Sequence, residues 1–140
     1  FLPEKIRNDL INHLFKKIVN ENFKEFSKKL YMNKENILEM SSDKFSFGSH
    51  GTYHKWLEHC DEKKQEQEIK ESVLFYRKNI PNEKNLSFCY PYGSYNNKTI
   101  KLLKKYNLRF SFTTTPEVIS TKNIMKKFHF PRLDTNDFLS

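Results

Sequence analysis

Residues 4–19 carry apolar side chains three or four positions apart, which places them on one face of an amphipathic helix. These apolar positions are Ile6, Leu10, Ile11, Leu14, Phe15 and Ile18. Pro3 precedes them, and proline suits the entry to a helix because the N–H that it lacks has no partner in the first turn. The pattern therefore predicts a helix over residues 4–19.

Two shorter helices are predicted after this one. The apolar residues of the first are Phe23, Phe26 and Leu30. The second covers residues 33–41, with Asn33 as a candidate N-cap. A full capping box has Glu or Gln three positions after the cap, whereas this chain has Asn36 there. Residues 41–43, Ser-Ser-Asp, are expected to end this helix.

From residue 44 the pattern changes to the two-residue period of a strand. Over residues 44–49, Phe45, Phe47 and Ser49 alternate with polar or glycine residues. This alternation predicts a strand. Residues 50–61 are irregular and hold three His, one Trp and one Cys.

Helix and strand patterns alternate over the rest of the chain. The predicted elements, in order, are a helix over residues 62–78, a strand over residues 86–90, the turn Pro91-Tyr92-Gly93, a helix over residues 96–106, and strands over residues 110–114 and 129–133. Pro81 is expected to stop the first of these helices, since proline breaks helical hydrogen bonding. Asn96 is the candidate cap of the second, and Asn107 can take the left-handed conformation that closes it.

Strands that alternate with helices through short connections indicate parallel βαβ units. We expect an α/β fold with parallel strands, preceded by a helical N-terminal segment. The helical segment covers residues 1–43 and the α/β segment residues 44–140, within one domain overall, because 140 residues fit a single domain. Ligands gather at the carboxyl ends of strands in such folds, so the segments after Ser49, Tyr90 and the last strand are the places to search.

The chain is basic, with a formal net charge of +8. A basic surface can attract nucleic acid, but Lys is interleaved with Glu, as in residues 62–70, and no run of five basic residues occurs. We therefore expect a solvated basic surface and no nucleic-acid partner. Binding to DNA or RNA with steep salt dependence would favour the opposite interpretation.

Cysteine usage and hydropathy bear on the compartment. Cys60 and Cys89 make no disulfide framework, which favours a reducing compartment such as the cytoplasm. No stretch approaches the ~20 apolar residues of a membrane span, and no signal peptide is visible. The chain begins at Phe1 rather than Met, so we expect the native start to lie upstream. The sequence does not indicate an oligomeric state.

Two histidines follow the first predicted strand directly, at His50 and His54. Both rings can turn towards one point if the segment makes a helical turn, and imidazole nitrogen is a good zinc ligand. Spacing alone leaves a pair of loop histidines equally open, while the position at a strand end favours a metal site. The other histidines, interpreted as structural, are His13, His59 and His129.

Two further strand ends carry candidate chemistry. In the turn over residues 90–95, Gly93 lets a ligand approach the backbone, and backbone N–H groups there could hold an oxyanion. The alternative is an ordinary aromatic-rich turn. At the last strand, Arg132 and Asp134 can face one side of the sheet, and the alternative is a surface ion pair of little energetic weight.

Four segments occur in a fixed order: FSFGSHGTYHKWL, FCYPYGSYN, KLLKKYNLRFSFTTTP and FPRLDTNDF. The first resembles the second motif of the polysaccharide deacetylases (carbohydrate esterase family 4, the NodB-homology domain), where a strand ends in Gly-Ser-His and a second His follows four residues later. The others resemble that family's third motif, the helix and strand after it, and the Pro-Arg-Ile-Asp ending of one subgroup. The resemblance covers residues 31–138 and rests on order and gaps that agree between His50 and Asp137.

The resemblance implies a hydrolase that removes N-acetyl, sometimes O-acetyl, groups from an acetylated carbohydrate, built on an irregular (β/α) barrel. It implies a divalent metal, usually zinc, held by His50, His54 and an Asp. The metal polarises the acetyl carbonyl and activates water, and a second Asp is the general base. The backbone N–H of Tyr92, between Pro91 and Gly93, would hold the oxyanion, with Asp134 also on the substrate side.

The sequence departs from the family at several points. The Asp-Asp motif that supplies the base and the third metal ligand has no equivalent here and is expected upstream of Phe1. Gly51 stands where Ser or Thr often follows the first His, and Cys89 stands where Arg often opens the third motif. Arg132 is the candidate to take over that Arg's task of orienting the base. The late Leu-x-x-His motif, which supplies a general acid, is not recognisable.

Two functional interpretations follow. The first is a catalytic deacetylase present as a fragment, which an Asp-Asp pair missing from the full reading frame would contradict. The second is a non-catalytic relative that serves as a carbohydrate-binding or structural module. Trp56, Tyr53 and Tyr95 could stack on a sugar ring in either case, and packing in the core or its rim is the alternative for each.

Overall fold

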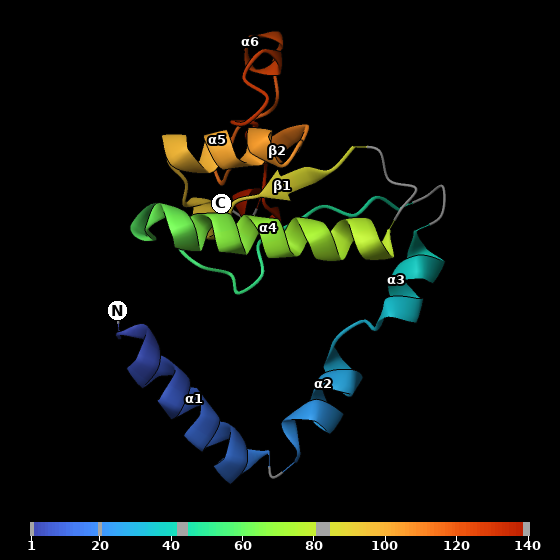
Figure 1. The fold of residues 1–140 in the computed structure, drawn as a ribbon, viewed down its shortest axis with the longest axis vertical. Helices are drawn as coiled ribbons and strands as arrows, with labels where there is room; N and C mark the ends of the chain where they lie inside the picture. The colour runs from blue at the N-terminus through green and yellow to red at the C-terminus, as the bar shows by residue number, and fades with distance from the viewer. Residues whose placement is uncertain (1, 20, 42–44, 81–84, 139–140) are drawn as a thin grey trace. The chain divides into compact units, whose positions relative to one another are not determined.

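The computed structural model describes residues 2–19, 21–41, 45–80 and 85–138 (Figure 1). Backbone contacts divide the chain into two compact units, unit 1 over residues 1–37 and unit 2 over residues 38–140. The predicted boundary after residue 43, the start of the predicted strand at Lys44 and the predicted helix stop at Pro81 lie outside the described residues. These three expectations stay predictions.

Unit 1 consists of helices at the positions that the apolar spacing predicts. α1 spans Glu4–Ile18, α2 spans Phe23–Leu30, and α3, which crosses the division between the units, spans Lys34–Met40. All three predicted helices are therefore confirmed. In the described part of the whole chain, no helix has the combination of length and apolar character that crossing a bilayer requires.

Asparagine side chains cap α2 and α3. The Asn22 side chain accepts the N–H of Lys24 at 2.9 Å. The Asn33 side chain accepts the N–H of Asn36 at 2.8 Å, and the Asn36 side chain accepts the N–H of Asn33 at 3.1 Å. This reciprocal pair is a capping box with Asn in the place of Glu, so the N-cap predicted at Asn33 is confirmed.

Aromatic contacts join α1 to α2, while most of the remaining apolar side chains stay exposed. Phe15 stacks on Phe23 with ring centroids 3.9 Å apart and meets Phe26 edge-on at 5.1 Å. None of the described residues of α2 or α3 is buried. The exposed apolar residues of α1 are Ile6, Leu10, Ile11, Leu14 and Ile18. Local helix formation, rather than a closed core, therefore accounts for this unit.

Unit 2 contains the predicted alternation of helix and strand. α4 (Glu62–Asn79), β1 (Ser87–Cys89), α5 (Asn97–Lys105) and β2 (Phe110–Phe112) lie at predicted positions. The described residues of this unit also contain four short helical turns. η1 (Leu57–His59) precedes α4, η2 (Pro91–Gly93) lies between β1 and α5, and α6 (Thr121–Ile124) and η3 (Thr135–Phe138) follow β2. Of these four, only η2 coincides with a predicted turn.

Both ends of α5 close as the sequence predicts. The Asn96 side chain accepts the N–H groups of Lys98 at 2.9 Å and Thr99 at 3.2 Å. Asn107 follows the helix with φ +57°, a left-handed conformation that asparagine tolerates better than most residues. Local side-chain chemistry therefore sets the length of this helix.

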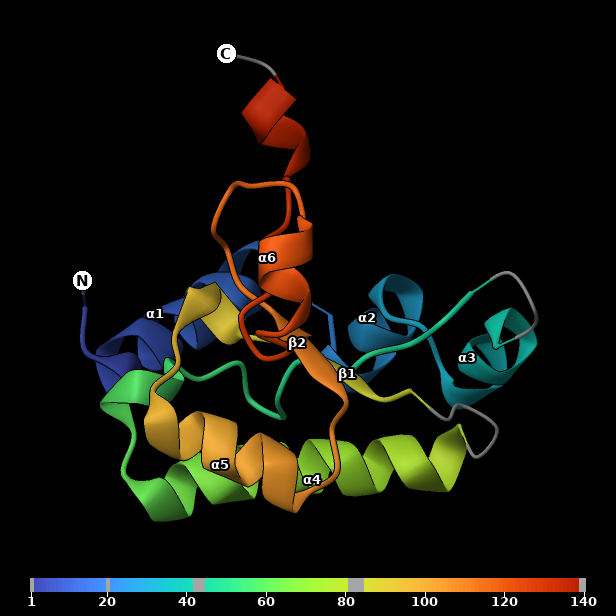
Figure 2. The same ribbon diagram turned by 90° about the horizontal axis from the view of Figure 1, so that it is seen from above.

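β1 and β2 form a two-stranded parallel sheet in which Phe88 pairs with Ser111 (Figure 2). Ser49 forms one parallel bridge with Phe88, and Phe130 forms one with Phe112. Four parallel segments therefore lie side by side in the order in which they occur along the chain. The result is a mixed α/β unit, as predicted, with more helix than strand among the described residues.

The predicted strands over residues 44–49 and 129–133 are wrong in extent, because each pairs through a single residue among those described. The Tyr76 hydroxyl donates to the carbonyl oxygen of Phe47 at 2.7 Å, so a helix side chain takes that acceptor. Pro131 follows the other bridge, and proline has no N–H to donate to a ladder. Pairing partners, which a single strand's pattern does not show, decide where each segment stops being a strand.

α4 and α5 pack against each other beside the strands (Figure 2). Gln65 and Thr99 are fully buried where the helices meet, and the Thr99 hydroxyl donates to the Gln65 side chain at 2.7 Å. The Ser49 hydroxyl donates to the Ser72 hydroxyl of α4 at 2.8 Å. The apolar core of this unit is Leu57, Ile69, Val73, Tyr76, Ile80, Leu86, Phe88, Tyr90, Leu102, Leu103 and Leu108.

β2 buries its polar residue rather than its aromatic ones. Ser111 is 0% exposed, whereas Phe110 and Phe112 are only half-buried. The Ser111 hydroxyl donates to the Tyr90 hydroxyl at 2.7 Å, and that hydroxyl donates to the carbonyl of Phe128 at 3.0 Å. The alternation of Phe and polar residues therefore predicts the strand correctly without indicating which face is covered.

Candidate metal centre

The segments that follow Ser49 and Cys89 leave the same edge of the parallel strands. The Ser49 N–H donates to the carbonyl of Ser87, and the Cys89 N–H donates to the carbonyl of Ser49, each at 2.9 Å. The two segments therefore run in the same direction, and their carboxyl ends meet. This arrangement brings residues 50–54 beside the turn over residues 91–93.

The rings of His50 and His54 converge at this edge. Their Nε2 atoms lie 3.0 Å apart, and the ring centroids are 4.7 Å apart in an edge-on arrangement. Two nitrogen ligands of one tetrahedral zinc ion, each at ~2.0–2.1 Å from the metal, are about 3.3 Å apart. The two imidazoles therefore fit a zinc ion as two of its ligands.

A backbone carbonyl determines the tautomer of His50. The Nδ1 atom of His50 lies 2.8 Å from the carbonyl oxygen of Cys89. Because a carbonyl oxygen only accepts hydrogen bonds, Nδ1 carries the hydrogen and the lone pair of the neutral ring is on Nε2. A hydrogen bond of this kind from the outer nitrogen is the usual companion of a metal-bound histidine.

The backbone between the two histidines takes unusual conformations. Gly51 has φ +80° and His54 has φ +55°, both in the left-handed region that favours glycine. A Cβ at position 51 would also lie 3.2 Å from the Glu68 side chain. Glycine therefore suits position 51, where the family often has Ser or Thr, because the backbone there has a positive φ and the Glu68 side chain leaves little room for a Cβ.

Glu68 of α4 accepts hydrogen bonds from the backbone of this loop. Its carboxylate accepts the backbone N–H groups of Thr52 at 3.0 Å and Tyr53 at 2.8 Å. Its own carbonyl accepts the Thr52 hydroxyl at 3.0 Å. Glu68 is 3% exposed, although it belongs to the Lys- and Glu-rich stretch of residues 62–70 from which the sequence predicts a solvated surface. Its place next to Ile69, on the side of the helix that faces the core, is the signal that could have identified it.

The electrostatic surroundings of His54 favour its neutral form. Burial, and then the neighbouring His50, lower the pKa of His54 below its ordinary value, while the charge of Glu68 acts in the opposite direction. A histidine must be deprotonated to bind a metal. The net shift therefore favours the state that a ligand needs.

An exposed row of aromatic rings adjoins the histidines. The His54 ring meets the Tyr92 ring edge-on with centroids 4.5 Å apart. Tyr92 stacks on Trp56 at 4.7 Å, and Trp56 stacks on His59 at 5.8 Å. Tyr53 is exposed nearby in sequence. Of the three residues named as possible sugar platforms, Trp56 thus lies in the row that contacts the histidine pair.

The turn over Pro91, Tyr92 and Gly93 presents its backbone beside His54. Tyr92 has φ +56° and Gly93 has φ +68°, and a Cβ at position 93 would collide with the Thr114 hydroxyl. Pro91 is buried. Within the described residues, the N–H of Tyr92 donates to no protein acceptor. The expectation that this N–H holds an oxyanion stays a prediction.

Arg132 and Asp134 lie together at a small cavity in the described structure. They line a cavity of about 110 Å³ together with Thr114, Pro116 and Asp137. The Asn136 backbone N–H, ahead of smaller contributions, lowers the pKa of Asp134. Burial raises the pKa of the Cys89 thiol, and the charge of Arg132 partly offsets this rise. In the described ranges, no hydrogen bond or ion pair joins Arg132 or Asp134 to either histidine, so their roles stay predictions.

Tyr95 and His129 form a separate contact. The Tyr95 hydroxyl lies 3.0 Å from Nδ1 of His129, and the Tyr95 ring stacks on Tyr90 at 4.2 Å. These contacts give Tyr95 a packing role.

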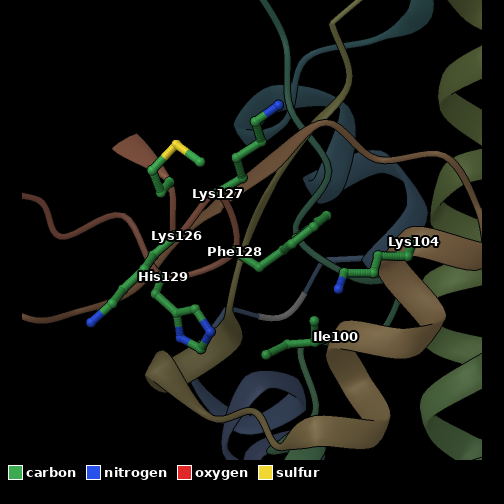
Figure 3. Close-up of a pocket in the computed structure, with 7 residues that line it drawn as sticks. Ile100, Lys104, Lys126, Lys127, Phe128 and His129 are labelled. Carbon is green, nitrogen blue, oxygen red and sulfur yellow. The ribbon is translucent and has the colours of Figure 1, made fainter. Parts of the chain in front are cut away.

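A larger cavity, about 390 Å³ in volume, adjoins His129 (Figure 3). Its lining residues are Ile100, Lys104, Met125, Lys126, Lys127, Phe128 and His129. Lys104 reaches over the Phe128 ring, with its Nζ 5.6 Å from the centroid. Figure 3 shows Lys126 and Lys127 pointing in opposite directions. The three ammonium groups therefore do not gather around one point, as a strong anion site would need.

The histidine pair lacks a third protein ligand within the described residues. No group of three His, Cys, Asp or Glu side chains there has an arrangement that could hold a metal ion. A zinc site with an open position for chemistry has three protein ligands. What the chain shows is therefore two converging ligands of such a site, with the expected Asp not among them.

Residues 8–111 match the family model described as polysaccharide deacetylase. The chain belongs to this family. The match confirms the resemblance that the His50–His54 and Pro91–Gly93 segments indicate, and the family consists of carbohydrate deacetylase hydrolases. No curated protein matches the chain.

Two solved structures are among those that resemble this chain. One is the Streptococcus pyogenes deacetylase PplD in complex with acetate, with 23% sequence identity and a TM-score of 0.68 over 82% of this chain and 52% of that one. The other is a de-N-acetylase from Aggregatibacter actinomycetemcomitans, with 17% identity and a TM-score of 0.43 over 56% of this chain and 30% of that one. The chain thus spans about half the length of the first of these, and that similarity shows a shared fold.

Proposed function

We propose that this family member forms part of a metal-dependent hydrolase that removes N-acetyl, or O-acetyl, groups from a carbohydrate, with His50 and His54 as two ligands of a divalent metal. The observation that carries the proposal is the 3.0 Å separation of the two Nε2 atoms. The carbonyl of Cys89 supports it, because it leaves the lone pair of His50 on Nε2. Zinc is the metal that we propose, since imidazole nitrogen is one of its usual ligands.

The four parallel segments are, in this proposal, consecutive strands of an irregular (β/α) barrel. Their order in space follows their order in the chain, and right-handed helical crossovers between parallel neighbours produce such an arrangement. The carboxyl ends of the strands, where barrel enzymes keep their active sites, are the ends that carry the two histidines and Tyr92.

When bound, a divalent metal polarises the acetyl carbonyl and makes water a stronger nucleophile at neutral pH. His50 and His54 would hold it through Nε2. The free N–H of Tyr92 would donate to the acetyl oxygen as negative charge develops there. Pro91 and Gly93 would keep that N–H in place, since they flank it in the turn. The Thr114 side chain lies against Gly93 and leaves no room for a Cβ there.

The exposed aromatic row would receive the sugar. Trp56 and Tyr92 stack with an interplanar angle of 24°, and aromatic faces of this kind pack against the apolar face of a sugar ring. Arg132 would orient the carboxylate base, and Asp134 would contact sugar hydroxyl groups. Both of these roles rest on motif position rather than on a contact with the histidines.

The proposal requires an Asp ligand and an Asp base that the described residues do not supply. The family pattern places both in an Asp-Asp motif, and we propose that sequence upstream of Phe1 contributes it. Acetate release from an acetylated amino-sugar oligomer would then need that segment joined to this chain.

The first experiment measures zinc retained by the purified chain after zinc exposure and desalting. The variants are His50→Ala and His54→Ala, with His13→Ala as the control because His13 is an exposed histidine of α1. We expect up to one zinc per chain, lost in both site variants and kept in the control. Retention that does not depend on His50 or His54 would contradict the metal assignment.

A non-catalytic relative is the second candidate, and the lack of a third ligand among the described residues favours it. The two candidates differ in one measurement on the chain extended through its native upstream sequence. Acetate release that requires His50 identifies the hydrolase. Binding of the oligomer without acetate release, unchanged in His50→Ala, identifies the binding module.

A further inference from the structure

Glu68 is a buried carboxylate that accepts hydrogen bonds from the histidine loop. It lies in α4, 3% exposed, and its Oε2 atom accepts the N–H groups of Thr52 and Tyr53 at 3.0 and 2.8 Å. A carboxylate that accepts backbone N–H groups forms stronger hydrogen bonds than a neutral acceptor does. Desolvating it without these partners would be costly.

The two N–H groups belong to residues between the metal-ligand candidates. His50 is fixed on one side by its contact with the Cys89 carbonyl at 2.8 Å. His54 lies at the other end of the loop and has φ +55°, a conformation that persists only where surrounding contacts impose it. Glu68 is the group that ties the intervening backbone to α4.

We propose that Glu68 is a positioning residue of the metal centre, whose carboxylate holds the backbone at Thr52 and Tyr53 so that the His50 and His54 rings meet at one point. This inference rests on the proposed function for the identity of the centre. Geometry alone supports the loop attachment, because the carbonyl of Glu68 also accepts the Thr52 hydroxyl at 3.0 Å.

Gln65 shows what a purely structural residue on the same helix face looks like. It is fully buried, and its hydrogen bonds join α4 to Thr99 of α5 and to the carbonyl of Cys60. Glu68 makes no such tie between the two helices within the described residues. Its side chain is therefore dedicated to the loop rather than to the helix pair.

The test compares three variants of this chain. Glu68→Gln keeps the length and one acceptor but loses the charge. Glu68→Asp keeps the charge but is one methylene shorter. Glu71→Gln is the control, because it makes the same chemical change on the same helix at a residue whose side chain bonds Gln67 instead.

The first readout is amide hydrogen exchange, which needs no metal. We expect exchange at Thr52 and Tyr53 to quicken about tenfold or more in both Glu68 variants, with the α5 amides unchanged, since each lost bond to a charged acceptor is worth ~1.5–3 kcal/mol. Wild-type exchange at these two amides in Glu68→Gln and Glu68→Asp would overturn the inference.

The second readout is zinc affinity, measured by competition with a chromophoric chelator. Loss of an outer positioning group typically weakens metal binding ~10–100-fold, and we expect this for Glu68→Gln but not for Glu71→Gln. Equal zinc affinity in wild type and both Glu68 variants would overturn the positioning role. Zinc binding that survives His50→Ala would instead contradict the proposed function, while the exchange data would still decide whether Glu68 holds the loop.

Discussion

Unit 1 and unit 2 contain the same kind of amphipathic helix, but only unit 2 buries the apolar face. Leu10 and Ile11 of α1 are 47% and 53% exposed, whereas Ile69 and Val73 of α4 are 0% exposed. Both helices form where periodicity predicts them. A helix obtains most of its stability from what packs on its apolar face. The comparison therefore shows that the pattern that predicts a helix does not by itself predict the packing that stabilises it.

The hydrogen bonds of the two units differ in the same way. In unit 1 the described side-chain bonds are local, such as Lys28 to Glu25. In unit 2 many of them join distant segments, as when Thr99 donates to Gln65 or Glu68 accepts from the histidine loop. Distant bonds form only with the tertiary fold, and we therefore expect changes in unit 2 to affect its cooperative unfolding.

The largest expected difference in the free energy of unfolding is between two leucine-to-alanine variants, one in each unit. Leu103→Ala removes a side chain that is 0% exposed in α5, and Leu10→Ala removes one that is 47% exposed in α1. We expect the free energy of unfolding to fall by ~2–5 kcal/mol in the first case and by less than about 1 kcal/mol in the second. Urea unfolding measures both, followed by Trp56 fluorescence for Leu103→Ala in unit 2 and by circular dichroism for Leu10→Ala in unit 1. Similar losses in the two variants would remove the distinction between the units.

A smaller effect is expected from a pair of tyrosines. Tyr90→Phe removes the acceptor of the buried Ser111 hydroxyl, which leaves that hydroxyl without this partner and lowers the free energy of unfolding by ~1–3 kcal/mol. Tyr31→Phe, at a residue that is 73% exposed, should change nothing measurable. Thermal unfolding of both variants checks this, and an unaffected Tyr90→Phe would show that Ser111 finds another acceptor.

The helix caps sharpen the comparison further, since asparagine is the N-cap in both units. Asn96→Ala loses the cap of α5 and Asn22→Ala loses the cap of α2, and a lost N-cap typically costs ~1 kcal/mol. We expect Asn96→Ala to lower the urea midpoint reported by Trp56. Asn22→Ala should lower helix content by circular dichroism while that midpoint stays the same. A shift of the midpoint by Asn22→Ala would show that the two units unfold together.

The smallest expected effect is on how the stability of the fold changes with pH. Hydrogen bonds from the Lys105 ammonium and then the Tyr106 hydroxyl lower the pKa of Glu66 below 4.5, its ordinary value. A lowered folded-state pKa stabilises the fold above that ordinary value, and the contribution is lost as the pH falls through the folded-state pKa. Glu66→Gln should therefore melt slightly below wild type at neutral pH, with the gap closing in acid. A gap that widens below about pH 4 would reverse the assigned sign.

The candidate site was partly predictable. His50 and His54 stand out in the sequence because they follow a strand at a spacing that metal ligands use, and the structure brings their rings together. The contact of Cys89 with His50 and that of Glu68 with the loop were not predicted. Both come from residues more than a dozen positions away, and no local pattern marks a carbonyl or a helix carboxylate as a partner of a distant loop.

The sequence by itself determined the helices α1 to α5, the Asn33 and Asn96 caps and the family, because periodicity, capping and motif spacing act over a few residues at a time. The tertiary structure decided how far each outer strand pairs, why β2 buries Ser111 rather than its phenylalanines, and which carboxylate supports the histidines. Each of these depends on which distant segment lies opposite a given side chain. Burial and hydrogen bonding are properties of such pairs of segments, so a pattern within one segment cannot specify them.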